Sequence, residues 1–233
     1  MFTSRSQIQD ALSRVGRRLA LADAGEYALL VCGGSALNLA GIIDRPTRDV
    51  DVLGLVIGTD ELSVVPALLP EEVTWAVEMV ARDLNLPGDW LNDSALEVHR
   101  LGLPAGIMKR ADKREFGPCL TVYLLGRQDQ VALKLYAAID RTKGQRHFKD
   151  LTDINPTRTE MQFAMHWLLD RKSSPQFRAA VRDVSEALGF ADLGDLAAAE
   201  SRAKSKAKKS RTLSPPPKKS AKQRRRPASP ASS

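Results

Sequence analysis

Two aspartates separated by one residue are the side chains whose types and spacing most clearly suggest chemistry. Asp49 and Asp51 alternate with Val50 and Val52. On a β-strand, residues i and i+2 share a face, so this spacing predicts both carboxylates on one side and both valines in the core. Two carboxylates roughly 7 Å apart repel each other unless a cation lies between them. Hard oxygen ligands favour Mg²⁺ or Mn²⁺ over zinc, so the pair predicts a divalent metal site; the alternative is a half-exposed strand whose acids are merely solvated.

A diglycine turn lies shortly before the acid pair. The apolar run over residues 27–32 predicts a buried strand, which Gly33 and Gly34 interrupt. A short helical pattern begins at Ser35. A strand, a glycine turn and a helix start leave backbone N–H groups pointing into a concavity, so we expect Gly34 and Ser35 to hold phosphate oxygens through backbone N–H and hydroxyl groups. A phosphate site beside two carboxylates predicts phosphoryl or nucleotidyl transfer.

Together these residues resemble a known signature. Gly33-Gly34-Ser35 followed by Asp49-Val50-Asp51 is similar to the signature of the nucleotidyltransferase superfamily. The longer pattern Arg45-x-Thr47-x-Asp49-x-Asp51 resembles the variant of bacterial AbiEii-like toxins and related minimal nucleotidyltransferases. The resemblance implies a mixed sheet flanked by helices and a metal-dependent transfer of a nucleoside monophosphate from a nucleoside triphosphate.

The resemblance continues along the chain and implies roles there. Trp90-Leu91-Asn92, the run 134–141 and the run 147–153 follow in order, so the likeness covers roughly residues 27–190. It implies that Lys134 contacts the triphosphate and that Asp150 orients a basic group or polarises the acceptor. Salt bridging on an exposed helical surface is the alternative for both. The implied catalytic residues are Asp49, Asp51, Lys134 and Asp150, and the implied nucleotide-binding residues are Gly33, Gly34, Ser35, Arg48, Lys134 and Arg141.

Many nucleotidyltransferases hold a third metal-binding carboxylate on a later strand, between two hydrophobic residues. Glu97, between Leu96 and Val98, fits that pattern, and Asp93 competes with it for the role. The run over residues 120–125 has no acid at its centre, which departs from the commoner pattern. A site with only two carboxylates still holds a metal if nucleotide phosphates and water complete the octahedron.

The composition is that of an ordinary globular protein. The chain has 233 residues, of which 43% are hydrophobic and 27% charged, so one substantial core with a helical appendage is expected. Cys32 and Cys119 lie in apolar runs, which favours reduced thiols and a cytoplasmic protein. We expect no signal peptide and no membrane contact, because no apolar stretch is long enough. The scattered histidines form no zinc set, and no Ser-His-Asp arrangement, Walker loop or dinucleotide-binding motif is present.

The basic excess is concentrated after residue 200. Residues 201–233 hold twelve Lys and Arg and no acid, whereas residues 1–200 hold 23 basic and 28 acidic residues. The net charge of +7 therefore divides into a tail of +12 and a remainder of −5. Such a Lys-, Arg-, Pro- and Ser-rich segment cannot bury enough apolar surface to fold, so we expect a disordered tail. It either attracts nucleic-acid phosphates in a salt-dependent way or serves only as a solubilising segment.

Hydrophobic periodicity predicts the elements that must position the site. Beyond the strand at 27–32, strands are expected at 52–57 and 120–125. Helices are expected at 6–22, 70–84, 126–141, 157–168, 176–188 and 192–200. Thr157 and Glu160 form a candidate capping box, and Trp90 is expected as a core anchor. The predicted fold is α/β (α+β), with a nucleotidyltransferase-like core over 1–126, a helical region over 127–200 packed on it, and a tail over 201–233.

These expectations combine into one functional hypothesis. An acceptor hydroxyl attacks the α-phosphorus of a nucleoside triphosphate and releases pyrophosphate, with Mg²⁺ or Mn²⁺ held by Asp49 and Asp51. The resemblance to toxin-type members implies RNA, such as tRNA, or a protein as the acceptor, and a cognate antitoxin as a partner. The basic tail favours nucleic acid. The alternative is a catalytically degenerate protein that binds nucleotides or nucleic acid, or a partner protein without activity of its own.

Overall fold

A computed structural model of the chain describes residues 1–139, 144–172 and 174–193. The strands of its mixed sheet are β1 (Tyr27–Cys32), β2 (Val50–Ile57), β3 (Ser63–Val65), β4 (Leu91–Asn92), β5 (Asp112–Glu115) and β6 (Leu120–Leu124). The α-helices are α1 (Arg5–Leu21), α2 (Gly33–Leu39), α3 (Glu71–Leu84), α4 (Ile107–Arg110), α5 (Arg127–Ala138), α6 (Gly144–Ile154), α7 (Arg158–Arg171) and α8 (Pro175–Ala187), and a 3-10 helix, η1, covers Ser94–Leu101.

The strand order is β3-β2-β1-β6-β5, and β4 pairs with β2 beside this path. β1 is central, antiparallel to β2 and parallel to β6. The register slips between β1 and β2, because Leu30 pairs with Gly54 and Val31 pairs with Val52. Leu53 is thereby left without a partner on β1, and Nε2 of His99 donates to its carbonyl at 2.6 Å. The half-buried imidazole thus contacts the carbonyl that has no partner on β1.

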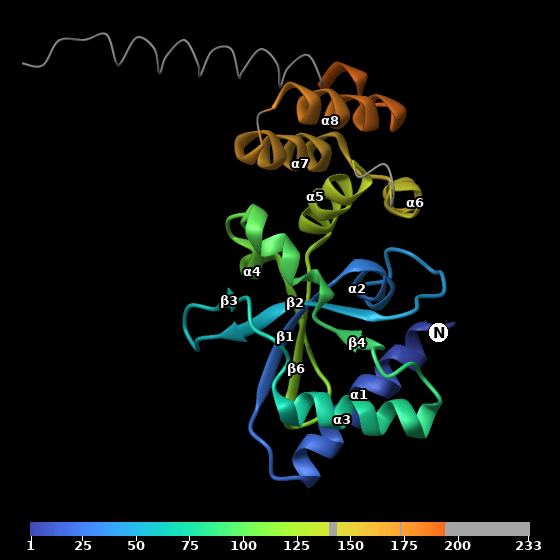
Figure 1. The fold of residues 1–233 in the computed structure, drawn as a ribbon, viewed down its shortest axis with the longest axis vertical. Coiled ribbons are helices and arrows are strands. Elements are labelled where there is room, and N and C mark those ends of the chain that lie inside the picture. The colour runs from blue at the N-terminus through green and yellow to red at the C-terminus, as the bar shows by residue number, and fades with distance from the viewer. Residues whose placement is uncertain (140–143, 173, 194–233) are drawn as a thin grey trace, which may run out of the picture. The chain divides into compact units, whose positions relative to one another are not determined.

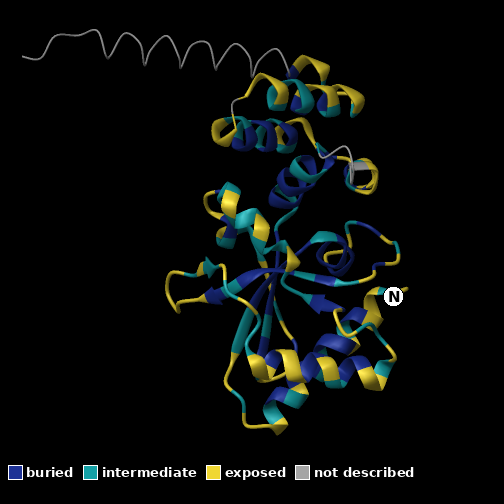
Figure 2. Cartoon of the chain, in the orientation of Figure 1, coloured by how far each residue is buried: buried dark blue, intermediate teal, exposed yellow. Residues whose placement is uncertain are grey.

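Two apolar cores lie on the two faces of the sheet. Leu29 and Val31 belong to the core that α1 and α3 cover, whereas Leu30 and Cys32 belong to the core that α5 and α7 cover. This alternation along β1 is the period of two that a strand between two layers of helices requires. Figure 1 shows α1 and α3 side by side against the sheet and α5, α7 and α8 stacked beyond its other end. Figure 2 shows β1, β2, β6, α2 and α5 as the most buried elements.

Most of the long elements confirm the periodicity. α1 begins after its N-cap Ser4, α3 covers the expected 70–84 span, and α7 begins with the predicted Thr157–Glu160 capping box. Trp90 is completely buried, as expected of a core anchor. The short strands β3, β4 and β5 were not predicted, because two to four residues are too few to establish a period.

Several boundaries differ from those predicted. α2 begins at Gly33 rather than at Ser35, and α5 ends at Ala138 rather than at residue 141. Residues 191–193 are helical, and the rest of the helix expected at 192–200 lies outside the described residues. The predicted tail at 201–233 also lies outside the described residues. No helix among the described ranges is both long and apolar enough to cross a membrane.

Candidate functional site

The carboxylate of Asp51 faces the backbone of Gly33. Cys32 pairs with Asp51 in the β1–β2 ladder, so the turn that follows β1 lies beside the acid. A Cβ built on Gly33 would lie 2.6 Å from Oδ2 of Asp51, closer than real Cβ contacts come. Gly33 also has φ +76°, a conformation that favours glycine. The backbone conformation therefore favours glycine at position 33, and a Cβ there would have to displace the carboxylate of Asp51.

The two aspartates lie where β2 begins. Val50 and Val52 are completely buried, whereas Asp49 and Asp51 are half-buried. The alternation predicted from the sequence is therefore present, although Asp49 precedes the first residue of the strand.

Electrostatics at the pair favours a cation. Burial raises the pKa of Asp51, and the negative charge of Asp49 raises it further. Lys134 and Arg146 lower the pKa of Asp51, as does a side-chain hydrogen bond with Asn92. A divalent ion relieves this kind of repulsion, and carboxylate oxygens are the ligands that Mg²⁺ and Mn²⁺ prefer. Asp49 and Asp51 therefore fit such an ion, although the described residues contain no group of three His, Cys, Asp or Glu side chains placed to hold one.

A buried carboxylate holds two cations close to the pair. Asp150 on α6 is 1% exposed, and its Oδ2 accepts a 2.6 Å hydrogen bond from Nζ of Lys134 on α5. Its Oδ1 accepts from the guanidinium of Arg45, in the loop between α2 and β2. Burial raises the pKa of Asp150, but Lys134 and Arg45 outweigh burial, so the pKa lies below its ordinary value. Lys134 and Asp150 therefore form a buried ion pair, not the exposed helical salt bridge of the alternative interpretation.

Arg45 also lies against the first turn of α2. A Cβ built on Gly34 would lie 3.3 Å from a terminal nitrogen of Arg45 and 3.2 Å from the hydroxyl of Thr47. The carbonyl of Arg45 accepts a hydrogen bond from Asn38 at 2.8 Å, which ties the loop back onto α2. Asp150 and α2 therefore fix the guanidinium in place between them.

Two buried polar atoms in this region have no hydrogen-bond partner. They are Nε2 of Gln130 and Nδ1 of His147, for which no described residue is a partner. The other amide atom of Gln130, Oε1, accepts from the N–H of Gly33 at 3.1 Å. Burial lowers the pKa of His147, and the positive charge of Lys134 lowers it further. Unsatisfied donors and acceptors in a buried cluster are a feature of sites that bind polar ligands.

The first residues of the chain brace the loop that carries Arg45 and Asp49. Phe2 and Thr47 exchange two backbone hydrogen bonds of 2.8 and 3.0 Å. The ring of Phe2 packs edge-on against Trp90, with ring centroids 5.6 Å apart. The loop is thus fixed from the side opposite to α6.

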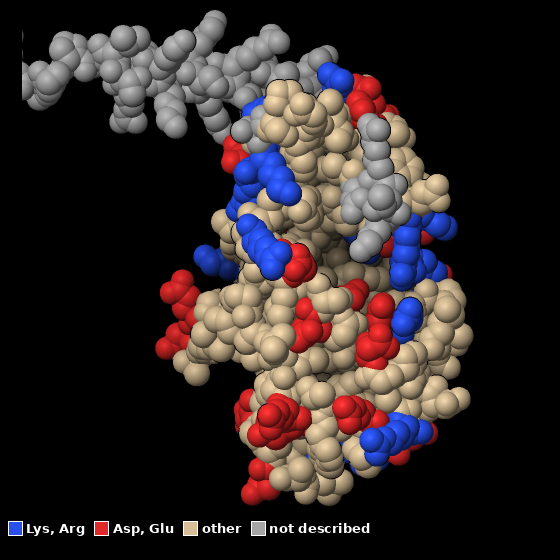
Figure 3. Space-filling model, in the orientation of Figure 1, with Lys and Arg blue, Asp and Glu red and all other residues tan. Residues whose placement is uncertain are grey.

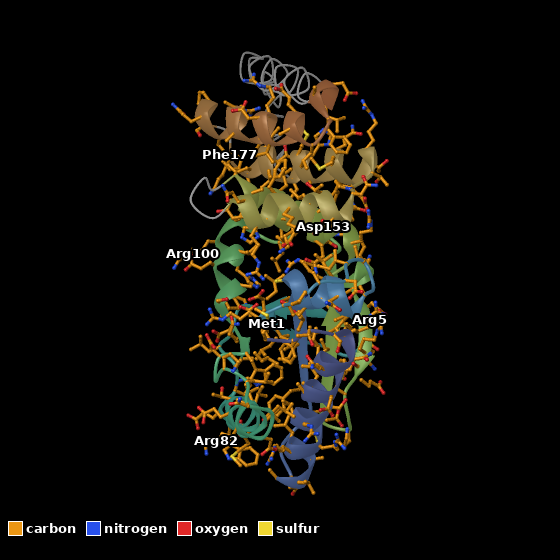
Figure 4. The ribbon with its side chains drawn as sticks, turned by 90° about the vertical axis from the view of Figure 1, so that its right-hand side faces the viewer. Met1, Arg5, Arg82, Arg100, Asp153 and Phe177 are labelled. Carbon is orange, nitrogen blue, oxygen red and sulfur yellow. The ribbon has the colours of Figure 1, made fainter. Side chains whose placement is uncertain are left out.

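The surface around this cluster is hollowed. Figure 3 shows a hollow between α5 and the region of α2 and β2, with acidic side chains on the sheet side and basic side chains on its flanks. In the side view of Figure 4, side chains fill the space between α6, which carries the labelled Asp153, and the elements below it. Opposite charges thus meet where the helical region faces the sheet.

The structure does not bring every predicted residue to this cluster. Glu97 lies in η1 rather than on a strand, and its exposed carboxylate pairs with Arg100 at 3.2 Å, which corrects its assignment as a strand-borne third ligand. Asp93 accepts from the N–H of Leu69 at 3.3 Å. Arg48 is exposed and pairs with Asp89 at 3.5 Å. Arg141 lies outside the described residues.

The phosphate-binding residues are only partly available. Ser35 is completely buried, and its hydroxyl contacts the carbonyl of Cys32 at 3.5 Å. The N–H of Gly33 is taken by Gln130. With the Gly33 N–H and the Ser35 hydroxyl already engaged, Lys134 and Arg45 are the groups best placed to contact a phosphate.

Arg45 and Asn92 belong to the segments that carry the resemblance, which implies that Trp90-Leu91-Asn92 lies near the site, but neither they nor Gln130 were among the predicted site residues. Arg45 opens the motif that ends at Asp51, and Asn92 follows the conspicuous Trp90, so both carried a local signal. Gln130 precedes Lys134 by one helical turn on α5, which places both side chains on one face of the helix. Its contact with Gly33 spans 97 residues and has no local signal.

Comparisons with known proteins add no assignment. No protein-family model matches the chain, and no curated protein matches it.

Proposed function

We propose that the chain is a metal-dependent nucleotidyltransferase, which moves a nucleoside monophosphate from a nucleoside triphosphate to a hydroxyl group of RNA or protein. The observation that carries the proposal is the approach of Gly33 to the carboxylate of Asp51, with the Lys134–Asp150–Arg45 cluster close by. A side chain at position 33 would have to displace the carboxylate of Asp51, so the glycine keeps that carboxylate in place. The resemblance of the motif from Gly33 to Asp51 supports the same function.

The acidic side of the site would hold the metal. Asp49 and Asp51 would supply its carboxylate oxygens, and the phosphates of the nucleotide and water would complete its coordination. When bound, the ion would neutralise charge on the triphosphate and align the α-phosphorus for attack. The raised pKa of Asp51 is consistent with this role, because a bound cation offsets the cost of keeping both carboxylates ionised.

The cationic side would receive the negative charge that moves to the leaving group. The acceptor oxygen forms a bond to the α-phosphorus, the bond from that phosphorus to the bridging oxygen breaks, and the hydroxyl proton passes to water. Pyrophosphate leaves with the bonding electron pair. Lys134 and Arg45 would bind its oxygens, since fixed cations stabilise charge that develops in the transition state. Asp150 would act as a positioning residue, because it holds both cations before the nucleotide arrives.

The test follows the α-phosphate. Each nucleoside triphosphate, labelled at the α-phosphate, is incubated with the full chain, Mg²⁺ and either total RNA or total protein. We expect label to enter one of the two pools with one nucleotide, and Asp51→Asn to abolish this transfer. Binding of a nucleotide by calorimetry without transfer of label to either pool would contradict the enzyme and favour the degenerate binding protein. Label that enters equally with Asp51→Asn would exclude the proposed site.

A further inference from the structure

The side chain next to Asp51 on the neighbouring strand is an amide. β4 runs parallel to β2, and Asn92 is the register partner of Asp51. Register partners on adjacent strands extend their side chains from the same face of the sheet. The position where a third carboxylate could stand beside Asp51 is therefore occupied by a neutral hydrogen-bonding group.

Backbone groups fix the orientation of this amide. Oδ1 of Asn92 accepts from the N–H of Ser94 at 3.0 Å, and Nδ2 donates to the carbonyl of Asp89 at 3.3 Å. An amide rotated by half a turn would lose both bonds, so oxygen and nitrogen are unambiguously placed. Nδ2 carries a second hydrogen, which is free for the carboxylate of Asp51. The interaction with Asn92 in turn lowers the pKa of Asp51, against the effects of burial and of Asp49.

The strand that carries Asn92 is anchored in the core. Trp90 is completely buried, and its Nε1 donates to the carbonyl of Val77 at 3.1 Å. Its own carbonyl accepts from the N–H of Val50 at 2.6 Å. Leu91 is 3% exposed. The backbone on both sides of the Asp51–Asn92 pair is thus held in place, as a side chain that positions another requires.

We propose that Asn92 is a positioning residue for Asp51. A hydrogen bond from Nδ2 of Asn92 would restrict rotation of the Asp51 carboxylate and so keep Oδ2, the oxygen that faces Gly33, directed at the metal. The inference rests on the proposed function, because it takes the acid pair as the ligand set. Groups that orient metal ligands in this way commonly contribute about 10–100-fold to metal affinity. Asn92 thus orients Asp51 without adding a third negative charge beside the pair.

The test measures binding of Mn²⁺ alone to the full chain, by the loss of the electron paramagnetic resonance signal of free Mn²⁺. Asn92→Leu keeps the size of the side chain but removes its donors, and we expect it to bind Mn²⁺ about tenfold more weakly than wild type. The matched control is Asp10→Asn, because Asp10 lies on α1 and pairs with Arg14 at the surface, away from the acid pair. We expect the control to stay within about twofold of wild type. The melting temperature of each metal-free variant shows that the measurement is made on folded protein.

The outcomes separate this proposal from the proposed function. Equal Mn²⁺ affinity of wild type and Asn92→Leu overturns the role of Asn92. Loss of affinity in Asp93→Asn but not in Asn92→Leu assigns the third ligand to Asp93 and also overturns it. Wild type that binds Mn²⁺ no better than Asp51→Asn instead removes the metal site. If Asn92→Leu does not fold, Asn92→Ser retains an oxygen for the N–H of Ser94 on a shorter side chain, and the same tenfold loss is expected.

Discussion

The Cα of Gly33 lies against the carboxylate of Asp51, so closely that an added Cβ would be 2.6 Å from Oδ2. The contact joins the end of β1 to the start of β2, where Cys32 and Asp51 are paired. Because the obstructing atom belongs to the proposed metal ligand, any side chain at position 33 would have to displace it. The backbone conformation and the position of Asp51 thus both favour glycine at this residue.

Gly33→Ala is therefore expected to damage both stability and the site. The positive φ alone should lower the free energy of unfolding by about 1–2 kcal/mol. Displacement of Asp51 should weaken Mn²⁺ binding by about tenfold or more. Urea unfolding and Mn²⁺ titration measure the two effects. Gly25→Ala is the matched control, since a Cβ at Gly25 meets nothing within 4 Å. Equal Mn²⁺ affinity in wild type and Gly33→Ala would contradict the proposed geometry.

Asp51→Asn is expected to stabilise the metal-free protein at neutral pH. The pKa of Asp51 is raised in the folded state, first by burial and then by Asp49. A raised acid pKa gives stability that is lost as pH rises from the ordinary value, 3.8, through the folded-state value. The asparagine removes this loss, so the stability of the variant relative to wild type should be greater at pH 7 than at pH 3. Thermal unfolding across this pH range, without divalent ions, measures the difference.

When Mg²⁺ is present, we expect wild type to become more stable than Asp51→Asn. Mg²⁺ should raise the melting temperature of wild type but not of Asp51→Asn, because a ligand stabilises only the state that binds it. Active sites commonly contain residues that lower the stability of the free protein but are needed for its function. If Mg²⁺ stabilises both proteins equally, the ion binds elsewhere.

Asp150→Ala is expected to be among the more damaging single changes. It leaves Lys134 and Arg45 without the carboxylate that both contact, and removing one partner of a buried ion pair costs about 3–5 kcal/mol. Because the pKa of Asp150 is lowered, its contribution is present above pH 3.8 and is lost as pH falls through its folded-state pKa. Asp153→Ala, which breaks an exposed pair with Lys149, should cost less than about 1 kcal/mol. Similar losses in the two variants would argue against a buried cluster.

The basic tail is tested by removal of residues 201–233. The segment carries twelve positive charges and no acid, so its loss turns a net charge of +7 into −5. If it contacts nucleic acid, retention of RNA by the full chain should fall steeply between about 50 and 200 mM salt, and the shortened chain should lack that dependence. A tail of scrambled order with the same composition controls for charge alone. Retention that is unchanged by the truncation at every salt concentration would leave only the solubilising role.

The parts of the site that could be predicted are those that a local pattern encodes. The alternation of Asp51 with Val50 and Val52 predicts which side chains face the core, and a diglycine after an apolar run predicts a turn. The same local logic failed for Glu97, because two flanking hydrophobic residues are equally compatible with a 3-10 helix. A three-residue pattern is too short to separate a strand from a helix.

The remaining parts depend on contacts between distant residues. Arg45 and Asp150 are 105 residues apart, and Gly33 and Gln130 are 97 residues apart. No periodicity within one element reports such pairs, because they depend on how α5 and α6 pack on the sheet. The resemblance supplied Lys134 and Asp150 as functional residues, but it did not predict that Asp150 would bind Lys134 and Arg45 together.

The span between Phe2 and Asp150 has a consequence for the protein during its synthesis. Phe2 braces the loop from one side, and Asp150 restrains Arg45 from the other. A nascent polypeptide would expose Asp49 and Asp51 long before Asp150 left the ribosome. Until Asp150 has emerged, Arg45 and Lys134 lack the carboxylate that holds them, so the site cannot be complete before residues 1–150 have left the ribosome.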